Sequence, residues 1–556
     1  MSSAVIKSYC KFTVIPSWWK GTLLLMLFAL FLFAGYKAPL NGVHWDAPIY
    51  LYRAKLIAET GLLQSYAKHS QEIANQVKNR NWADDESFPE PYWHFSRLGN
   101  SLILGIVFYF IPNGLQAVTA ANWLYQVLLA ACVLLAVLLV QSLSSLFKSP
   151  FPRGQFIVAI IISAFLYGLS DIYAYLSGNL VSEVPALFFL IAATLSLVRA
   201  CEKASYRWAV VSGVLAFFLY VVRMESLWVY ASAVITLVLF LRIHTPESFQ
   251  WPIVVVAVTI LISLFCLYSW QFYPLADPRL FHSFGAIQEK VHNGVPPIKL
   301  MIASGGLLWV GITLCAHRLW AFTLGQFAVA WIMVQSIPYL YAIAYGMPAQ
   351  TRMYTLGMPA LMVASSQSWA LLLAHSNTSL GKRAIIIGIC VFLVAVSHST
   401  VYPVIRSVPG MWRLDGLRSV LAPPHYEKII YPLPVLWEIS QRLYGLKEPI
   451  ILLRGANIPQ EYTNLIRYFG PKIASETDLV LTPDPTNPGE CAKKLLKRET
   501  DQIVFCTYLG LSDVDKLRGR RLFLLESAEK RIENELQKTQ ILERNGIVIY
   551  ELKTRQ

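Results

Sequence analysis

The sequence predicts a polytopic α-helical membrane protein with about 11 transmembrane helices and a small soluble α/β domain at its C-terminal end. Of its 556 residues, 55% are hydrophobic and only 14% are charged, and the mean hydropathy is +0.48. A single water-facing globule cannot bury that much apolar surface. Apolar segments also recur at about 16 to 25 residues, the length at which a helix crosses about 30 Å of hydrocarbon with its backbone polar groups paired internally.

The predicted spans share this length and a near absence of charge. We place them at Gly21–Tyr36, Ala117–Val140, Phe156–Tyr173, Leu180–Val198, Trp208–Val222, Leu227–Leu241, Pro252–Tyr273, Leu300–Ala316, Leu319–Tyr341, Met353–Ala374 and Ala384–Val401. A shorter run, Leu102–Ile111, is followed by Pro112. We interpret it as a helix at the membrane interface, and the alternative is that it crosses the membrane.

Basic residues predict the orientation of these spans. With the interfacial interpretation, Lys and Arg gather on one side: Lys7, Lys11, Lys20, Lys148, Arg153, Arg199, Lys203, Arg207, Arg242, Arg318, Lys382 and Arg383. The positive-inside rule makes this side, with the N-terminus, cytoplasmic. The loop 37–98 of the membrane region 1–402 and the domain 403–556 are then extracytoplasmic. If Leu102–Ile111 crossed instead, the tail would be cytoplasmic and the charge bias would largely invert.

The C-terminal domain differs sharply in composition from the membrane region. Short strands are predicted at Pro449–Leu453, Asp478–Leu481, Gln502–Cys506, Arg521–Leu525 and Gly546–Leu552, and helices at Gln460–Tyr468 and Ser527–Leu542. Cys491 and Cys506 either form a disulfide or stay as free thiols. Without a phosphate loop or nucleophile elbow, the domain is interpreted as support for the membrane region or as part of acceptor recognition. The net charge of +14 comes partly from cytoplasmic loops and partly from a basic tail. Anionic lipid head groups are enough to explain it, so no nucleic-acid partner is indicated.

Polar residues collect at the extracytoplasmic ends of the spans, where ionisable groups are costly unless they are paired or wetted. The candidates are Asp46 after the first span, His94 and Arg97 before the interfacial run, Glu183, the Arg223 and Glu225 pair between two spans, and Arg352 with Tyr354. Their clustering on one side favours a shared polar cavity. A purely structural ion pair between Arg223 and Glu225 is the alternative interpretation.

In this order, and over most of residues 15–400, these motifs resemble the GT-C glycosyltransferases that use polyprenyl-phosphate-linked sugars, which include protein O-mannosyltransferases and the aminoarabinose transferases of lipid A. The matching segments are Asp46 within His44–Ile57, the proline and aromatic stretch Pro89–Trp93, Ser182–Pro185, Arg223–Glu225, and Arg352 with Tyr354 and Pro359. Ala47 stands where many members of that family have a second acid. Whether a divalent metal assists therefore stays open, and the sequence identifies no certain cofactor.

The resemblance implies transfer of a sugar from a polyprenyl-phosphate donor to an acceptor hydroxyl on a protein, lipid or glycan. Asp46 is the expected base, and Arg352, with Tyr354, is expected to bind the donor phosphate, because a guanidinium matches phosphate oxygens in pairs. The residues expected to line the site are Glu183, Arg223, Glu225, His94 and Arg97. A single displacement inverts the anomeric centre.

Two other classes of function stay open. A transporter or lipid flippase could use the same polar groups to bind and release a substrate, although the sequence shows no paired repeat. A ligase or polymerase of lipid-linked glycans would share the donor and transfer a longer chain. The sequon Asn377–Ser379 falls in a predicted cytoplasmic loop, which favours a bacterial plasma membrane over a lumenal location.

Overall fold

The computed structural model of the chain describes residues 22, 24–29, 31–32, 47–62, 98–112, 114–168, 173, 176, 180–223, 226–244, 251–272, 308–344, 355–374, 433–446, 450–454, 462, 465–466, 468–470, 478–480, 503–506, 521–527, 537–544 and 547–553. The chain divides into two compact units. One comprises Met1–Pro39 and Trp123–Lys428, and we call it the helical unit. The other comprises Leu40–Asn122 and Ile429–Gln556, and we call it the loop–tail unit.

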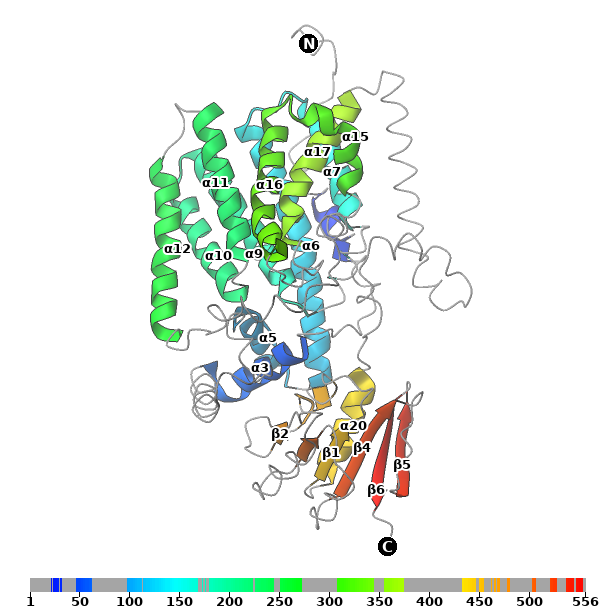
Figure 1. The fold of residues 1–556 in the computed structure, drawn as a ribbon. Helices are drawn as coiled ribbons and strands as arrows, with labels where there is room; N and C mark the ends of the chain where they lie inside the picture. The colour runs from blue at the N-terminus through cyan, green and yellow to red at the C-terminus, as the bar shows by residue number, and fades with distance from the viewer. Residues whose placement is uncertain are drawn as a thin grey trace, which may run out of the picture. The chain divides into compact units, whose positions relative to one another are not determined.

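The helical unit is a bundle of helices that lie side by side (Figure 1). Its described helices are α6 (Gly114–Leu146, from Trp123 onward), α7 (Arg153–Gly168), α9 (Glu183–Lys203), α10 (Tyr206–Val222), α11 (Ser226–His244), α12 (Trp251–Phe272), α15 (Leu308–Leu319), α16 (Thr323–Ala344) and α17 (Met358–Ala374). Each overlaps a span predicted from the apolar pattern. The predicted span Ala384–Val401 lies outside the described residues, as does part of Gly21–Tyr36.

Several of these helices are suited to a membrane. Among the described residues, four helices are long and apolar enough to cross one: Gly114–Leu146, Glu183–Lys203, Ser226–His244 and Thr355–Ala374. The count is up to five if Gly311–Leu319 and Thr323–Ile337, which meet at 113°, form one broken span. The shorter apolar helical stretches are Leu98–Phe110, Arg153–Gly168, Tyr206–Val222 and Trp251–Leu267. The coarse prediction of a polytopic helical chain is therefore supported, whereas the number of about 11 spans stays a prediction.

Helix α17 occupies the interior of the bundle, because every residue from Met358 to Leu372 is buried. It packs against α7, α15 and α16. The Ser163 hydroxyl of α7 donates to the Ser365 hydroxyl of α17 at 3.0 Å, and the Gln155 side-chain amide donates to the Ala370 carbonyl at 2.7 Å. Such interhelical hydrogen bonds satisfy polar groups that have no water to contact.

A glycine permits the close packing of α10 on α12. A Cβ atom added to Gly213 would lie only 2.5 Å from the carbonyl oxygen of Ala257 and 2.9 Å from the side chain of Ile260. Helices without a hydrophobic driving force between them associate through close backbone contacts at small residues. Gly213 is therefore the residue that sets the separation of these two helices.

The loop–tail unit begins with two helices that pack on each other, α3 (Ala47–Thr60) and α5 (Leu98–Phe110). Helix α3 overlaps the segment His44–Ile57, and the short apolar run Leu102–Ile111 overlaps α5. Gly105 of α5 lies against α3, since a Cβ atom there would be 3.2 Å from the Ile57 side chain and 3.3 Å from the Ala54 carbonyl. Close contact at this glycine fixes the pairing of the two helices.

The tail contains helix α20 (Leu433–Gly445) and a six-stranded sheet in the order β2-β3-β1-β4-β6-β5 (Figure 1). The strands are β1 (Ile450–Arg454), β2 (Asp478–Val480), β3 (Ile503–Cys506), β4 (Arg521–Ser527), β5 (Gln537–Arg544) and β6 (Ile547–Lys553). Strands β2, β3, β1 and β4 are parallel, and β6 runs antiparallel to β4 and β5. Five strands fall on segments where the sequence predicts strands.

The helix predicted at Ser527–Leu542 is wrong at its C-terminal end, because Gln537–Arg544 form strand β5. Arg544 pairs with Ile547 of β6, so the two strands form an antiparallel hairpin. The intervening sequence is Asn545-Gly546, a strong signal for a tight hairpin turn. Backbone pairing with β6 therefore outweighs the helical periodicity of this segment.

Candidate functional site

Two of the residues expected to line the site, Glu183 and Arg223, are described, and the structure brings them together. Glu183 is the first residue of α9, and Arg223 directly follows the end of α10. The other candidates lie outside the described residues: Asp46, His94, Arg97, Glu225, Arg352 and Tyr354. Their roles stay predictions, and the described geometry concerns the Glu183–Arg223 pair and its surroundings.

The local sequence explains why both side chains meet at the helix ends. Pro185 lies in the first turn of α9, where a proline is tolerated because its missing N–H has no intrahelical partner. At the end of α10, Arg223 has extended backbone angles, with φ −159° and ψ 102°. Its N–H still donates to the Leu219 carbonyl at 2.9 Å. The chain thus leaves the helix at Arg223 and turns into α11.

The two charges form a buried ion pair. Arg223 Nη1 lies 2.9 Å from Glu183 Oε1, and each side chain is only 1% exposed. The same Nη1 donates to the Ser182 hydroxyl at 3.0 Å, and that hydroxyl lies 3.5 Å from Glu183 Oε2. Removing two charges from water has a large desolvation cost, which mutual attraction offsets only when the geometry is close and further hydrogen bonds are made. Ser182 supplies one such hydrogen bond; the sequence placed it in the segment Ser182–Pro185 but did not predict it as a site residue.

Hydrogen bonds to neighbouring helices fix the two helices that carry this pair. The Ser212 hydroxyl of α10 donates to the Ala193 carbonyl of α9 at 2.8 Å and lies 2.7 Å from the Tyr230 hydroxyl of α11. Cys132 Sγ of α6 lies 3.9 Å from the Val184 carbonyl at the start of α9. Both helices that carry the pair are therefore fixed by contacts along their length.

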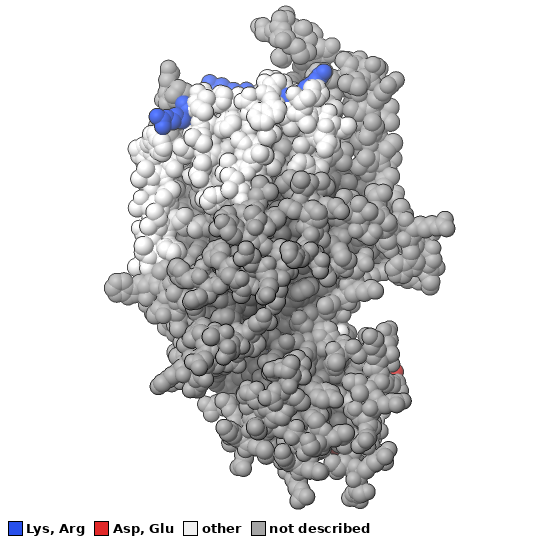
Figure 2. All heavy atoms as spheres, in the orientation of Figure 1, with Lys and Arg blue, Asp and Glu red and all other residues white. Residues whose placement is uncertain are grey.

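The pair lies at the helix ends that are remote from the basic residues of the bundle. The opposite ends of α9 and α10 carry Arg199, Lys203 and Arg207. In the described part of the helical unit, the remaining Lys and Arg residues besides Arg223 also lie within about one turn of a helix end, and they are Lys148, Arg153, Arg242 and Arg318. Figure 2 shows Lys and Arg along one edge of the bundle, above a face that is otherwise uncharged. Glu183 is at the opposite end of α9 from that edge, and α9 has 21 residues. At about 1.5 Å per residue the helix is about 30 Å long, which is about the thickness of the hydrocarbon layer of a membrane.

No group of three or more His, Cys, Asp or Glu side chains that could hold a metal ion occurs among the described residues. Cys491, one of the two cysteines that either form a disulfide or stay as free thiols, lies outside the described residues. No protein-family model matches the chain, and a search of curated proteins returns no significant match. The class that the described residues define is thus a helical protein with apolar helices suited to a membrane and a buried ion pair at one end of its bundle.

Proposed function

We propose that the protein is a membrane glycosyltransferase that moves a sugar from a polyprenyl-phosphate donor to an acceptor hydroxyl on the extracytoplasmic face. The observation that supports this proposal best is the buried pair of Glu183 and Arg223, which lies about one membrane thickness from the basic edge. By the positive-inside rule that edge is cytoplasmic. The pair then lies on the opposite side, where a flipped lipid-linked donor presents its sugar.

The Arg223 guanidinium suits a donor phosphate. A guanidinium keeps its charge in an apolar setting and offers several N–H donors in one plane. Glu183 and the Ser182 hydroxyl hold the Arg223 guanidinium through Nη1. We propose that this fixed cation, together with Arg352 and Tyr354, stabilises the negative charge that grows on the phosphate as it leaves. Glu225, His94 and Arg97 complete the lining in this proposal.

The reaction needs one base and one leaving group. The proposed base is the Asp46 carboxylate, which takes the proton of the acceptor hydroxyl as that oxygen attacks C1 of the sugar. The bond from C1 to the phosphate oxygen breaks in the same step, and the electron pair leaves with the polyprenyl phosphate. The products are the glycosylated acceptor, with inverted anomeric configuration, and the free lipid phosphate.

Transfer of radiolabelled sugar tests the proposal. Purified protein in liposomes receives a panel of polyprenyl-phosphate sugars and envelope extracts as acceptors. Wild type is compared with Asp46→Asn, and we expect transfer to fall about 100-fold or more, the lower end of what a general base contributes. Asp85→Asn, in the same loop, is the matched control and should retain transfer.

Two results would contradict the proposal. Equal transfer by wild type and Asp46→Asn would remove Asp46 as the base. Absence of transfer by wild type from every donor, combined with movement of the lipid-linked sugar across the vesicle membrane, would favour the flippase instead. Analysis of product length separates transfer of one sugar from transfer of a whole glycan.

A further inference from the structure

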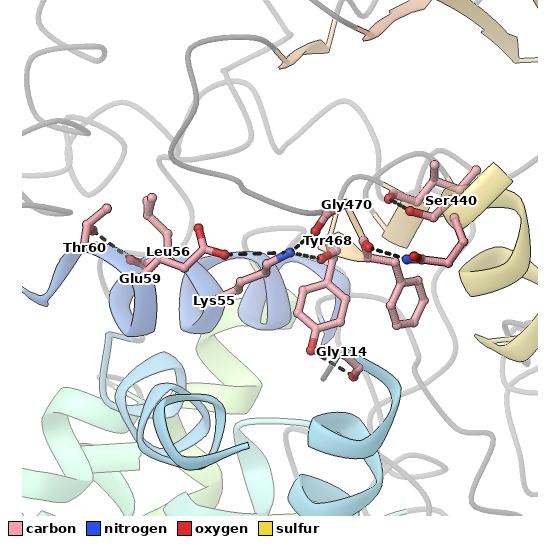
Figure 3. A network of polar contacts seen from close by, with 11 residues as sticks. Lys55, Leu56, Glu59, Thr60, Gly114, Ser440, Tyr468 and Gly470 are labelled. Carbon is pink, nitrogen blue, oxygen red and sulfur yellow. Dashed lines mark hydrogen bonds and ion pairs between the residues drawn. The ribbon is translucent and has the colours of Figure 1, made fainter. Parts of the chain in front are cut away.

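A single lysine of the first loop joins helix α3 to the C-terminal tail (Figure 3). Lys55 Nζ donates a hydrogen bond to the carbonyl oxygen of Tyr468 at 2.7 Å and another to the carbonyl oxygen of Gly470. Glu59, one turn along α3, places its carboxylate 3.8 Å from the same nitrogen. Lys55 Nζ also lies 5.7 Å from the centre of the Tyr468 ring. The ammonium group has three N–H donors, and the two carbonyls with the carboxylate can accept them.

The two carbonyls belong to the end of a short helical segment of the tail. The Phe469 N–H donates to the Leu465 carbonyl at 2.9 Å, and the chain leaves the helical conformation at Phe469 and Gly470. The last carbonyls of a helix have no intrahelical donor and carry partial negative charge, so a cation is favourable there. Lys55 fills this role from a distant part of the sequence.

Helix α20 holds this segment in place from the other side. The Ser440 hydroxyl donates to the Ile466 carbonyl at 2.9 Å, and the Gln441 amide donates to the Phe469 carbonyl at 3.2 Å. Gly470 packs so tightly that an added Cβ atom would lie 2.5 Å from the Tyr444 ring. The acceptors that face Lys55 are therefore fixed to the tail by contacts of their own.

Tyr468 also contacts two further helices, α6 and α5. Its hydroxyl donates to the Gly114 carbonyl at the start of α6, at 3.2 Å, and its ring lies 5.6 Å from that of Phe108 in α5. Burial raises the pKa of the Tyr468 hydroxyl above its ordinary value, and the charge of Glu59 raises it further. The hydroxyl therefore stays protonated and remains a donor at neutral pH.

We infer that Lys55 is a positioning residue that fixes helix α3 to the C-terminal tail and thereby sets the place of Asp46, the residue immediately before α3. The role of Asp46 in this inference rests on the proposed function. Lys55 follows Asp46 by about two and a half turns of helix. A helix transmits the position of one turn to the next because its backbone hydrogen bonds are continuous, so an anchor at Lys55 restricts where the start of α3 can lie.

Burial makes this anchor stronger than an ordinary surface contact. The Lys55 side chain is 15% exposed, against 26% for Glu59. Hydrogen bonds from a charged donor to fixed carbonyls are stronger than neutral ones, and leaving the carbonyls unpaired adds a desolvation penalty. The ion pair with Glu59 is a neighbouring i,i+4 contact on the same helix, which is weak by comparison.

Amide hydrogen exchange on the full-length protein tests the anchor without reference to activity. Lys55→Met keeps the length of the side chain and removes its donors. We expect exchange in Ala47–Thr60 and around Tyr468 to become about tenfold faster, with no change in α9 and α10. Glu59→Gln, which leaves both carbonyl bonds in place, is the matched control and should exchange like wild type. If both segments of Lys55→Met exchanged at the wild-type rate, the inference that Lys55 anchors α3 to the tail would be wrong.

Transfer kinetics then test the positioning role. We expect Lys55→Met to lower kcat with little change in KM for the lipid donor, because an interaction that only places the base acts on the reacting step. Lys55→Arg should recover part of kcat, since a guanidinium can donate to both carbonyls. An unchanged kcat in a variant whose tail exchanges faster would overturn the positioning role. Absence of transfer by wild type would instead overturn the proposed function. The hydrogen-exchange comparison of wild type and Lys55→Met would then be the test of whether Lys55 anchors α3 to the tail.

Discussion

The carboxylate of Glu183 lies 2.9 Å from the guanidinium of Arg223, at the adjoining ends of α9 and α10, and each side chain is 1% exposed. Two opposite charges that are both removed from water depend on each other, since either one alone would be a buried unpaired ion. The pair therefore links the stability of the bundle to the candidate site. This dependence leads to the first of four predictions.

Breaking the pair should destabilise the protein and abolish function. We expect Glu183→Gln or Arg223→Met to lower the free energy of unfolding by about 3 to 5 kcal/mol, the range for a buried pair that loses one partner. Thermal unfolding in detergent measures this. The double variant, with both Glu183→Gln and Arg223→Met, should recover much of the lost unfolding free energy, because no unpaired charge is left buried. Sugar transfer should remain lost.

Matched control variants are available on α9 and α10, at the helix ends away from Glu183 and Arg223. Glu202→Gln on α9 and Arg207→Met on α10 change exposed charges, so we expect changes within about 0.5 kcal/mol. If Glu183→Gln were no more destabilising than Glu202→Gln, the ion pair would have no structural role.

The second prediction concerns topology. Because Lys55 hydrogen-bonds to the tail, the first loop and the tail must lie on the same side of the membrane, and the basic edge predicts that this side is extracytoplasmic. In a bacterial host, alkaline phosphatase fused after Gln556 should be active, and a fusion after Lys203 should be inactive. Green fluorescent protein at the same positions should give the reverse pattern. Equal activity at both positions would contradict this topology.

The third prediction concerns helix packing. Gly213→Ala places a Cβ atom 2.5 Å from the Ala257 carbonyl, and a backbone atom cannot move aside without shifting α12. We expect a loss of about 1 to 3 kcal/mol in unfolding free energy, as for other overpacked sites, measured by thermal unfolding. Gly445→Ala, where nothing lies within 4 Å of the added atom, is the control. A loss no larger than that of the control would show that the helices adjust freely.

The fourth prediction concerns alkaline pH. Burial raises the pKa of Tyr468 above its ordinary value of 10.0, so at higher pH the unfolded chain releases this proton while the folded chain retains it. The stability contributed by the neutral hydroxyl is therefore complete below pH 10 and lost as pH rises above it. Tyr468→Phe, which has no proton to release, should show a smaller loss of stability between pH 9 and 11 in thermal unfolding. The same slope in wild type and variant would contradict this.

Parts of the candidate site could be predicted from the sequence because their signals are local. Glu183 follows a polar turn and precedes an apolar run, and Arg223 interrupts two apolar runs, so both are visible as charges at span ends. The sequence also suggests Arg223 as a partner for nearby Glu225. The described pairing with Glu183 depends on how α9 and α10 pack together, which no local pattern encodes.

Apolar spacing and charge placement by themselves determined the helical character of this chain, the approximate bounds of α6, α9 and α11, and the concentration of Lys and Arg at one end of the bundle. Tertiary structure alone decided that Lys55 caps the carbonyls of Tyr468 and Gly470, and that Gln537–Arg544 become a strand. The physical reason is the range of the interactions. Helix formation and membrane compatibility follow from neighbouring residues, whereas capping by a distant lysine and pairing of strands exist only once separate segments have packed.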